Sequence, residues 1–499
     1  MIGSLDLPTT RVTEREQTAT AGYAAFLGLV SAGLSAVLSA VRAKVNAVVL
    51  GPAGVGLAAE INQLVALAFV PVNILNGPAL VATTAEAAGR NDEDALVAAR
   101  RSALLCIGIS SVVAIALSTL AGRWVIASHG QLTWPLVLLS GLGLALTALG
   151  SVATGLLTGA GQLSKLTLLA LVNLCIVTVL MVSGTVLYGL TGQFIAIVVG
   201  GVVTLPISLG MARRALKLPP FRWELRVDLA FLRRAIGLGT TALIGGLAMQ
   251  SALSLVRVAL DHHGGPAENG QFQAAYMLGM LYFSVIAASL GNYAFPRFAA
   301  ARSDEELGRE VSETARFIGR LAPPLLIAGI ALRDVLIRTF YSKAFAPAID
   351  ALGYMTAADI TKAISWTFAG PLLYRGRVRG YLVTELLAAL GFGAGALLAI
   401  PRFGLMGVAY AYFASCCLNL LVSALALRAS FDLPMPWRPL VTAYAWSGVA
   451  LATQLVVRER LWVRALVLVG CAIMLYRTGF LSELAGRARR VLGRIFRRA

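Results

Sequence analysis

Apolar runs long enough to cross a membrane recur along almost the whole of this 499-residue chain. A run of roughly 18 or more apolar residues is typical of a membrane-spanning helix. The composition agrees, because 58% of the residues are hydrophobic and only 13% are charged, whereas charged residues make up about a quarter of an ordinary soluble domain. The chain is therefore predicted to be an all-α integral membrane protein.

The apolar runs predict about fourteen transmembrane helices. The predicted spans are 21–41, 55–80, 103–126, 134–158, 165–188, 193–212, 236–260, 270–294, 316–337, 347–372, 380–400, 405–427, 439–457 and 461–478. An even number of spans puts both termini on one side, and the arginine-rich tail places that side in the cytoplasm by the positive-inside rule. We expect a bacterial inner-membrane protein with both termini in the cytoplasm.

The positive charge of the chain follows the same orientation. Lys and Arg are about three times as frequent on the predicted inside segments as on the outside ones. The net charge of +18 is thus mostly an orientation signal. It favours contact with anionic membrane lipids and gives no reason to expect a nucleic-acid partner.

Two glycine-rich motifs each occur twice, at nearly the same separation of about 214 residues. The segment 51–56 (GPAGVG) resembles 265–270 (GPAENG), and 189–192 (GLTG) resembles 404–407 (GLMG). Each match alone is weak, but the shared offset predicts two similar six-helix bundles. Because six spans separate equivalent positions, both bundles should enter the membrane in the same orientation, as in transporters with parallel repeats.

The repeat also sets the expected domain organisation. The predicted parts are a cytoplasmic N-terminal segment (1–20), an N-terminal six-helix bundle (21–213), a cytoplasmic linker with an amphipathic piece (214–235), a C-terminal six-helix bundle (236–428), helices 13 and 14 (429–480) and a basic cytoplasmic tail (481–499). The amphipathic piece is expected along the cytoplasmic interface. Helices 13 and 14 have no counterpart in the repeat.

Ionisable residues within the predicted spans are candidate functional residues, because charge is costly inside a bilayer. Asp359 and Lys362 share a helix face at i,i+3, and Glu385 on the next span lies at nearly the same depth as Lys362. Two interpretations stay open for this set. It either forms a neutralised triad that fixes helix packing, or it forms a central site in which a carboxylate takes up and releases protons.

Basic residues precede both Gly-Pro-Ala turns. Arg42 and Lys44 lie before the first turn and Arg257 before the second. In a shared cavity they would suit a phosphate group, the arginines by bidentate hydrogen bonds. Alternatively, Lys44 snorkels to the outer headgroups, and Arg257 pairs with Asp261.

A third polar group lies in the second predicted span, where Glu60, Asn62 and Gln63 line a vestibule for sugar hydroxyls or bond to neighbouring helices. The sequence has only three histidines and no Walker-type phosphate loop. We therefore expect no metal site, no cofactor and no catalytic centre, and we expect a transporter rather than an enzyme.

Several of these stretches together resemble a known family. Residues 44–59 (KVNAVVLGPAGVGLAA), followed by Gln63, are similar to the first two helices of flippases for undecaprenyl-pyrophosphate-linked oligosaccharides, such as those for O-antigen and enterobacterial common antigen (lipid III). The other matching positions are Asp359-Ile-Thr-Lys362, Tyr381-Leu-Val-Thr-Glu385, Arg257, Pro296 and 404–412. The similarity spans about residues 20–430. These flippases belong to the multidrug/oligosaccharidyl-lipid/polysaccharide (MOP) exporter superfamily.

The resemblance implies two six-helix bundles around a positively charged cavity, and transfer of a lipid-linked sugar to the periplasmic leaflet by alternating access. Carried onto this chain, it implies that Lys44 and Arg257 contact the head group and that Asp359, Lys362 and Glu385 are central polar residues. The implied partners are the undecaprenyl-pyrophosphate-linked glycan, membrane lipids, and the polysaccharide polymerase and chain-length machinery. Helices 13 and 14 and the basic tail depart from the family pattern.

Two other functions remain as alternatives at this stage. A multidrug cation antiporter of the same superfamily would want acidic charge in its cavity, which the basic residues at 42, 44 and 257 disfavour. A membrane glycosyltransferase or polysaccharide polymerase is disfavoured by the missing large outer loop and by the duplicated halves.

Overall fold

The computed structural model describes residues 34–75, 77–90, 92–125, 133–220, 228–457 and 461–477. The predicted N-terminal segment 1–20, the tail 481–499 and most of the first predicted span lie outside these residues. The described part is helical throughout and contains no strand, which confirms the predicted all-α class. In a bilayer a helix satisfies its own backbone hydrogen bonds, so apolar runs of this length fold as helices.

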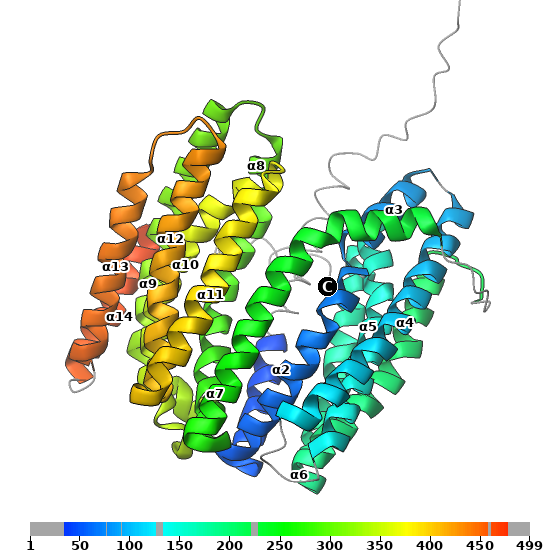
Figure 1. Cartoon of the computed structure of the whole chain (residues 1–499), viewed down its shortest axis with the longest axis horizontal. Helices are drawn as coiled ribbons and strands as arrows, with labels where there is room; N and C mark the ends of the chain where they lie inside the picture. Colours follow the sequence, from blue (N-terminus) through cyan, green and yellow to red (C-terminus); the bar gives the residue numbers. More distant parts are fainter. Residues whose placement is uncertain are drawn as a thin grey trace, which may run out of the picture.

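The helices of the first half occupy the right-hand group in Figure 1. Residues 34–49 form the first described helix. It is followed by α2 (Gly51–Leu75), α3 (Pro78–Gly89), α4 (Glu93–Val125), α5 (Thr133–Gly159) and α6 (Leu163–Ala215).

The second half begins with α7 (Leu229–Ser289), which is bent and lies between the two groups (Figure 1). The remaining elements are η2 (Leu290–Ala294), α8 (Phe295–Ala300), α9 (Asp304–Phe340), η3 (Lys343–Phe345), α10 (Ala348–Tyr374), α11 (Val378–Phe403), α12 (Leu405–Ser430), α13 (Trp437–Val457) and α14 (Leu461–Arg477). Helices α13 and α14 lie on the outer flank of this half, against α9 and α10.

Eight of the described helices are long and apolar enough to cross a membrane: α2, α4, α5, α6, α7, α11, α12 and α13. Two of them contain a glycine that bends the chain, Gly189 in α6 and Gly265 in α7. The two arms of α6 correspond to the predicted spans 165–188 and 193–212. The two arms of α7 correspond to the predicted spans 236–260 and 270–294. The chain is a multi-span membrane protein, and the exact number of crossings stays a prediction.

The repeated motifs adopt the same backbone conformation in both halves. Gly189 has φ 59° and ψ −136°, and Gly404 has φ 52° and ψ −131°. The other pair, Gly51 and Gly265, also has positive φ, at 63° and 75°. An L-residue with a side chain rarely adopts such angles, which explains why glycine stands at each of these turns. The sequence repeat is therefore a structural repeat at its turns.

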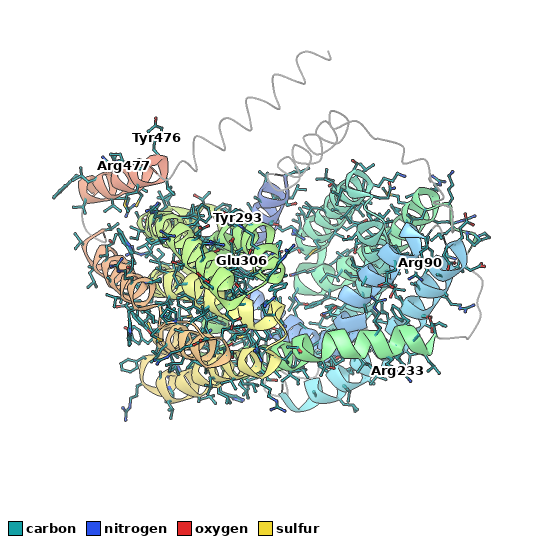
Figure 2. All side chains as sticks on the ribbon, turned by 90° about the horizontal axis from the view of Figure 1, so that it is seen from above. Arg90, Arg233, Tyr293, Glu306, Tyr476 and Arg477 are labelled. Carbon is teal, nitrogen blue, oxygen red and sulfur yellow. The ribbon has the colours of Figure 1, made fainter. Side chains whose placement is uncertain are left out.

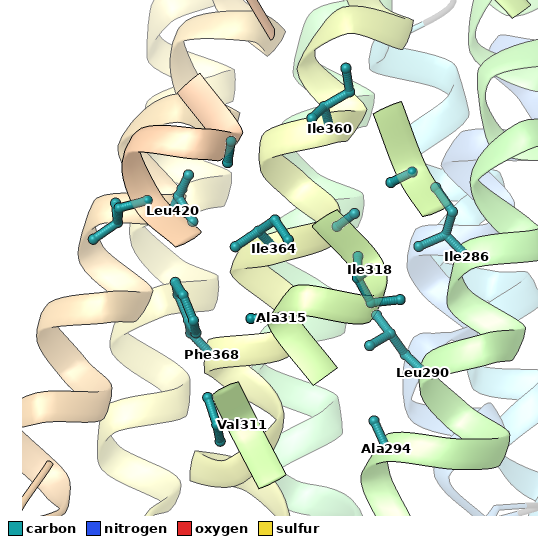
Figure 3. Close-up of a cluster of buried hydrophobic side chains, with 14 of the residues drawn as sticks. Ile286, Leu290, Ala294, Val311, Ala315, Ile318, Ile360, Ile364, Phe368 and Leu420 are labelled. Carbon is teal, nitrogen blue, oxygen red and sulfur yellow. The ribbon is translucent and has the colours of Figure 1, made fainter. Parts of the chain in front are cut away.

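Each half has a hydrophobic core, and a further buried cluster joins Ala47 and Val55 of the first half to second-half residues such as Phe272 and Phe392. In the first half, Ile61, Phe69 and Phe194 are among the buried residues of one cluster. In the second half, a cluster of side chains from α7, η2, α9, α10 and α12 fills the space between these helices (Figure 3). Its labelled members include Ile286, Ile318, Phe368 and Leu420.

The start of α7 packs onto the first half. Asp228 caps the helix by accepting from the backbone N–H of Ala230, and its own N–H donates to Ser102 on α4 at 2.9 Å. Phe231 is buried in the core of the first half. The predicted amphipathic piece of the linker is thus, from Leu229 onward, the continuous beginning of α7, while residues 221–227 lie outside the described part.

The upper end of the molecule in Figure 1 is the predicted cytoplasmic end. Viewed from above, Arg90 and Arg233 lie on the side of the first half and Arg477 lies at the end of α14 (Figure 2). The opposite end, where α2 and α7 meet, is the predicted outer end. This orientation is a prediction from charge.

Candidate functional site

The backbones of the two halves touch where α2 and α7 cross at two glycines. A Cβ on Gly56 would lie 1.8 Å from the carbonyl oxygen of Pro266, and a Cβ on Gly270 would lie 1.9 Å from the carbonyl oxygen of Pro52. The contact is reciprocal, because each glycine meets the proline of the other copy of the same motif. We call this contact the glycine crossing. It leaves no room for any side chain at either position and closes the predicted outer end.

Arg257 lies beside the glycine crossing and is almost fully buried, with 3% of its surface exposed. Its Nη1 donates to Oδ1 of Asn269 at 2.9 Å, its Nη2 donates to Oε1 of Gln273, and its guanidinium lies over the ring of Phe272. The Asn269 amide in turn donates to the carbonyl oxygen of Gly56 in the first half. Arg257 therefore supports the contact between the halves in this conformation, and it is not exposed to a cavity.

Glu60 brings a carboxylate to the same buried region. It is 3% exposed, and its charge interacts with those of Arg257 and Asp261. Its Oε2 atom has no hydrogen-bond partner among the described residues. A buried carboxylate oxygen without a partner is costly, since the water it lost is not replaced. The burial of Glu60 thus destabilises this conformation relative to one in which water reaches its carboxylate.

The two other residues of the predicted vestibule bind to helices. Ser140 Oγ on α5 donates to Oδ1 of Asn62 at 2.8 Å, which is a packing contact within the first half. Gln63 Nε2 donates to the carbonyl oxygen of Gln250 on α7 at 3.3 Å, so it joins the two halves. Both side chains are used for helix contacts in this conformation, as one of the two interpretations expected.

Lys44 and Arg42 contact different parts of the molecule. The Lys44 ammonium donates to the carbonyl oxygens of Arg338, at 3.1 Å, and of Tyr341, where α9 ends in the second half. A cation at a helix C-terminus binds unpaired carbonyls and complements the helix dipole. Arg42 contacts Ser39 and Met181 in the first half. Of the two, only Lys44 bridges the halves.

Asp359, Lys362 and Tyr412 form a hydrogen-bonded chain inside the second half. Lys362 Nζ donates to the Tyr412 hydroxyl at 3.0 Å, and this hydroxyl donates to Oδ1 of Asp359 at 2.7 Å. Lys362 Nζ lies 3.9 Å from the same carboxylate oxygen and 4.3 Å from the centre of the Phe283 ring. Asp359 is only 2% exposed. We call these three residues the central polar chain.

Glu385 on α11 adds a second carboxylate to this region. Its charge interacts with that of Lys362, and its side chain also contacts Tyr381. A Cβ placed on Gly245 of α7 would be 3.5 Å from its Cγ atom, so Glu385 lies against α7. The structure therefore brings together all three residues of the predicted central set, whereas Arg42, Lys44 and Arg257 each contact different partners.

The sequence did not identify every residue of these groups. Tyr412, Asn269 and Gln273 are uncharged and were not among the candidates, although Tyr412 lies in a stretch that resembles the flippase family. Their signal is positional: each is a polar side chain within an apolar span. Among the described residues, no group of three or more His, Cys, Asp or Glu is placed to hold a metal ion.

Comparison with known proteins identifies the family. Residues 90–350 match the model of a family described as polysaccharide biosynthesis protein, and the chain belongs to that family. The lipid III flippases of Escherichia coli (strain K12) and Shigella flexneri are both 23% identical over 379 residues, which cover 74% of this chain and 89% of theirs.

Solved structures share the fold. The lipid II flippase MurJ in its inward closed conformation matches with a TM-score of 0.69 at 13% identity, covering 91% of this chain and 99% of that one. A multidrug resistance MATE family transporter of the MOP superfamily, in an inward-facing conformation, matches with a TM-score of 0.68 at 17% identity, covering 79% and 94%. Together with the family match, these confirm the predicted superfamily and a transporter rather than an enzyme.

Proposed function

We propose that this protein flips an undecaprenyl-pyrophosphate-linked oligosaccharide from the cytoplasmic to the periplasmic leaflet of the bacterial inner membrane. The glycan would then enter the synthesis of a cell-surface polysaccharide, such as O-antigen, a common antigen or an exopolysaccharide. The similarity to lipid III flippases over most of both chains supports this class of substrate. The polymerase and chain-length machinery would act on the product.

The observation that carries the mechanism is the glycine crossing. It seals one end of the interface between the halves by direct contact of two backbones, which a small relative rotation would break. Besides α7, two other second-half elements reach the first half: η3 contacts α2, and the end of α9 binds Lys44 of the first described helix. Alternating access needs a contact of this kind at one end, because it must form and break in every cycle.

The polar groups near the crossing would take part when it opens. Separation of the halves would free Lys44 from the carbonyls at the end of α9 and would break the bond from Asn269, the partner of Arg257, to Gly56. Lys44, and Arg257 after it exchanges Asn269 and Gln273 for substrate oxygens, would then hold a pyrophosphate, Arg257 through bidentate hydrogen bonds. In this proposal they bind the head group during the passage and close the gate after its release.

The central polar chain is proposed as the coupling site. Protonation of Asp359 would remove the negative charge opposite Lys362 and weaken the acceptor of the Tyr412 hydroxyl. Because Asp359 on α10 faces α7 near Gly279, this change would act on the helix that lies between the halves. Uptake and release of one proton could thus bias the relative position of the halves.

Deletion of the gene followed by lipid analysis tests the proposal. We expect accumulation of a complete undecaprenyl-linked repeat unit that faces the cytoplasm. Wild-type protein should clear this lipid, and Arg257→Ala at equal expression should clear it at least tenfold more slowly. Arg309→Ala, at an exposed position on α9, is the matched control and should behave as wild type. Accumulation of an incomplete glycan would instead indicate an enzyme that extends the chain.

A further inference from the structure

A groove on the outer flank of the second half has four arginines at its rim. Its volume is about 530 Å³, and α9, α10, α13 and α14 line it. The four arginines are Arg316, Arg320, Arg438 and Arg477. They lie toward the start of α9, at the start of α13 and at the end of α14, so they gather at the predicted cytoplasmic end of the groove.

The floor of the groove is apolar. Ile360, Ile364 and Ile318 form part of it, and the same side chains belong to the buried core cluster of this half (Figure 3). Trp446 and Met474 form part of the walls. A site with a basic rim at the membrane surface and an apolar floor toward the membrane interior matches the layout of an anionic lipid.

The charges at the two ends of this helix group are balanced differently. At the predicted outer end, Arg464 on α14 pairs with Asp334 on α9 at 3.0 Å, and Arg333 donates to the carbonyl oxygen of Gln454 on α13. At the groove, none of the four arginines forms an ion pair with a carboxylate within the described part of the chain, and no acidic residue lines the groove. Four guanidinium groups around one opening repel each other unless an anion lies between them.

We propose that this groove binds an anionic glycerophospholipid of the cytoplasmic leaflet, with its phosphate held by the four arginines. Guanidinium groups bind phosphate oxygens in pairs and remain charged at any physiological pH. Binding would offset part of the positive charge of the rim and fasten α13 and α14 to α9. These two helices have no counterpart in the first half, so the lipid would stabilise a part of the molecule that lies outside the repeated bundles.

The lining distinguishes this lipid from a lipid-linked glycan. Sugar hydroxyls need hydrogen-bond acceptors as well as donors, yet apart from the arginines the lining offers only the Thr442 hydroxyl and the Trp446 indole N–H, which can only donate. All lining residues come from the second half, so the two halves cannot close around a ligand here. The groove therefore suits a phosphate with acyl chains, and the proposal does not depend on the proposed transport function.

Native mass spectrometry of the purified full-length protein tests the proposal, with phosphatidylglycerol added after delipidation. We expect one tightly bound phosphatidylglycerol, and at least tenfold weaker binding in the double variant Arg320→Gln/Arg438→Gln. The matched control is Arg233→Gln/Arg309→Gln, which removes the same charge from exposed arginines outside the groove and should bind as wild type. In Figure 2, Arg233 and Arg477 lie on opposite sides of the molecule.

Further measurements distinguish phosphatidylglycerol from other ligands, and distinguish a loss of binding from a loss of folding. Phosphatidylglycerol should not be displaced by an equal amount or a tenfold excess of phosphatidylethanolamine or of undecaprenyl phosphate. Millimolar inorganic phosphate should not displace it either. Displacement by undecaprenyl phosphate or inorganic phosphate would overturn the proposal, and so would equal binding in groove and control variants. A second double variant, Arg316→Lys/Arg477→Lys, keeps the charge and the fold but loses bidentate geometry, and should weaken binding at least threefold.

Discussion

The two halves of the protein share their turns but not their central chemistry. Gly189 and Gly404 have nearly the same backbone angles, and Gly56 and Gly270 meet reciprocally at the glycine crossing. In contrast, counting back about 215 residues from Asp359, Lys362 and Tyr412 leads to Leu144, Thr147 and Ile197. The contrast shows that the repeated elements provide the scaffold and the gate, whereas the polar chain belongs to one half only.

Substitutions at the glycine crossing, which both halves form together, test this comparison first because they should have the largest effect. Gly56→Ala and Gly270→Ala each place a methyl group within 2 Å of a backbone oxygen, and real Cβ atoms essentially never approach closer than 3.0 Å. Each variant should therefore prevent closure of the outer end and abolish transport. Because the contact is reciprocal, the two variants should be equally damaging.

The effect is measured as transport in a deletion strain. A second measurement replaces Val55 by cysteine and labels it with a membrane-impermeant maleimide added outside the cell. Val55 is buried at the crossing, and its label should be much stronger in the glycine variants than in the wild type. Gly210→Ala on α6 is the control, since no atom lies within 4 Å of its added Cβ. Unequal effects at Gly56 and Gly270 would show that the gate is not symmetric.

The second test addresses the asymmetric part. Lys362→Met removes the charge opposite Asp359, and an uncompensated buried charge costs roughly 3–5 kcal/mol. We expect a lower unfolding temperature and at least tenfold slower transport. The double variant Asp359→Asn/Lys362→Met should recover stability but not transport, if the pair couples transport to protons.

The counterpart position supplies the matched control. Thr147→Val removes a hydroxyl that donates only to the carbonyl oxygen of Gly143 in its own helix. It should therefore leave transport within twofold of wild type. If the double variant at Asp359 and Lys362 transported normally, the central polar chain would be a packing feature, which is the other interpretation that the sequence left open.

The repeat could be predicted from sequence because glycine is required wherever φ is positive or two backbones touch, so the motifs persist in both copies. The orientation of the basic residues could not be predicted in the same way. By the offset of 214, Lys44 aligns with Val258 and Arg257 aligns with Ala43. One residue along a helix turns a side chain by about 100°. Lys44 and Arg257 therefore reach different surroundings, and only the packed structure shows which.

The central set was predictable for a different reason. Asp359 and Lys362 are about one helical turn apart, and opposite charges within an apolar span are stabilised by pairing with each other. Tyr412 was harder to identify, since an uncharged tyrosine within an apolar span has no compulsory partner. Its role as the link between the two charges depends on how α10 packs against α12, which the helix patterns do not specify.

A third test concerns Lys44, a basic residue of the first half that reaches the second half. Lys44→Met removes the donor to the last carbonyls of α9, and a cation at a helix C-terminus contributes about 0.3–1 kcal/mol. The outer end should open more easily, with transport changed about two- to fivefold and stronger labelling at Val55. Arg42→Met, which loses contacts only within the first half, should have a smaller effect on labelling. Equal effects would mean that the bridge between the halves lies elsewhere.

The smallest effect is expected at the other end of the interface, where Arg234 on α7 pairs with Glu86 on α3 at the predicted cytoplasmic surface. Both side chains are exposed, at 37% and 53%, and such pairs contribute little to stability. Hydrogen bonding to Arg234 lowers the pKa of Glu86 from its usual 4.5. The small stabilisation is thus present above pH 4.5 and is lost only as the pH falls through the lowered pKa. Glu86→Gln should match wild type in transport at pH 7, and the two unfolding temperatures should converge in acid. Slower transport of Glu86→Gln at pH 7 would show that both ends of the interface, and not the glycine crossing alone, control the cycle.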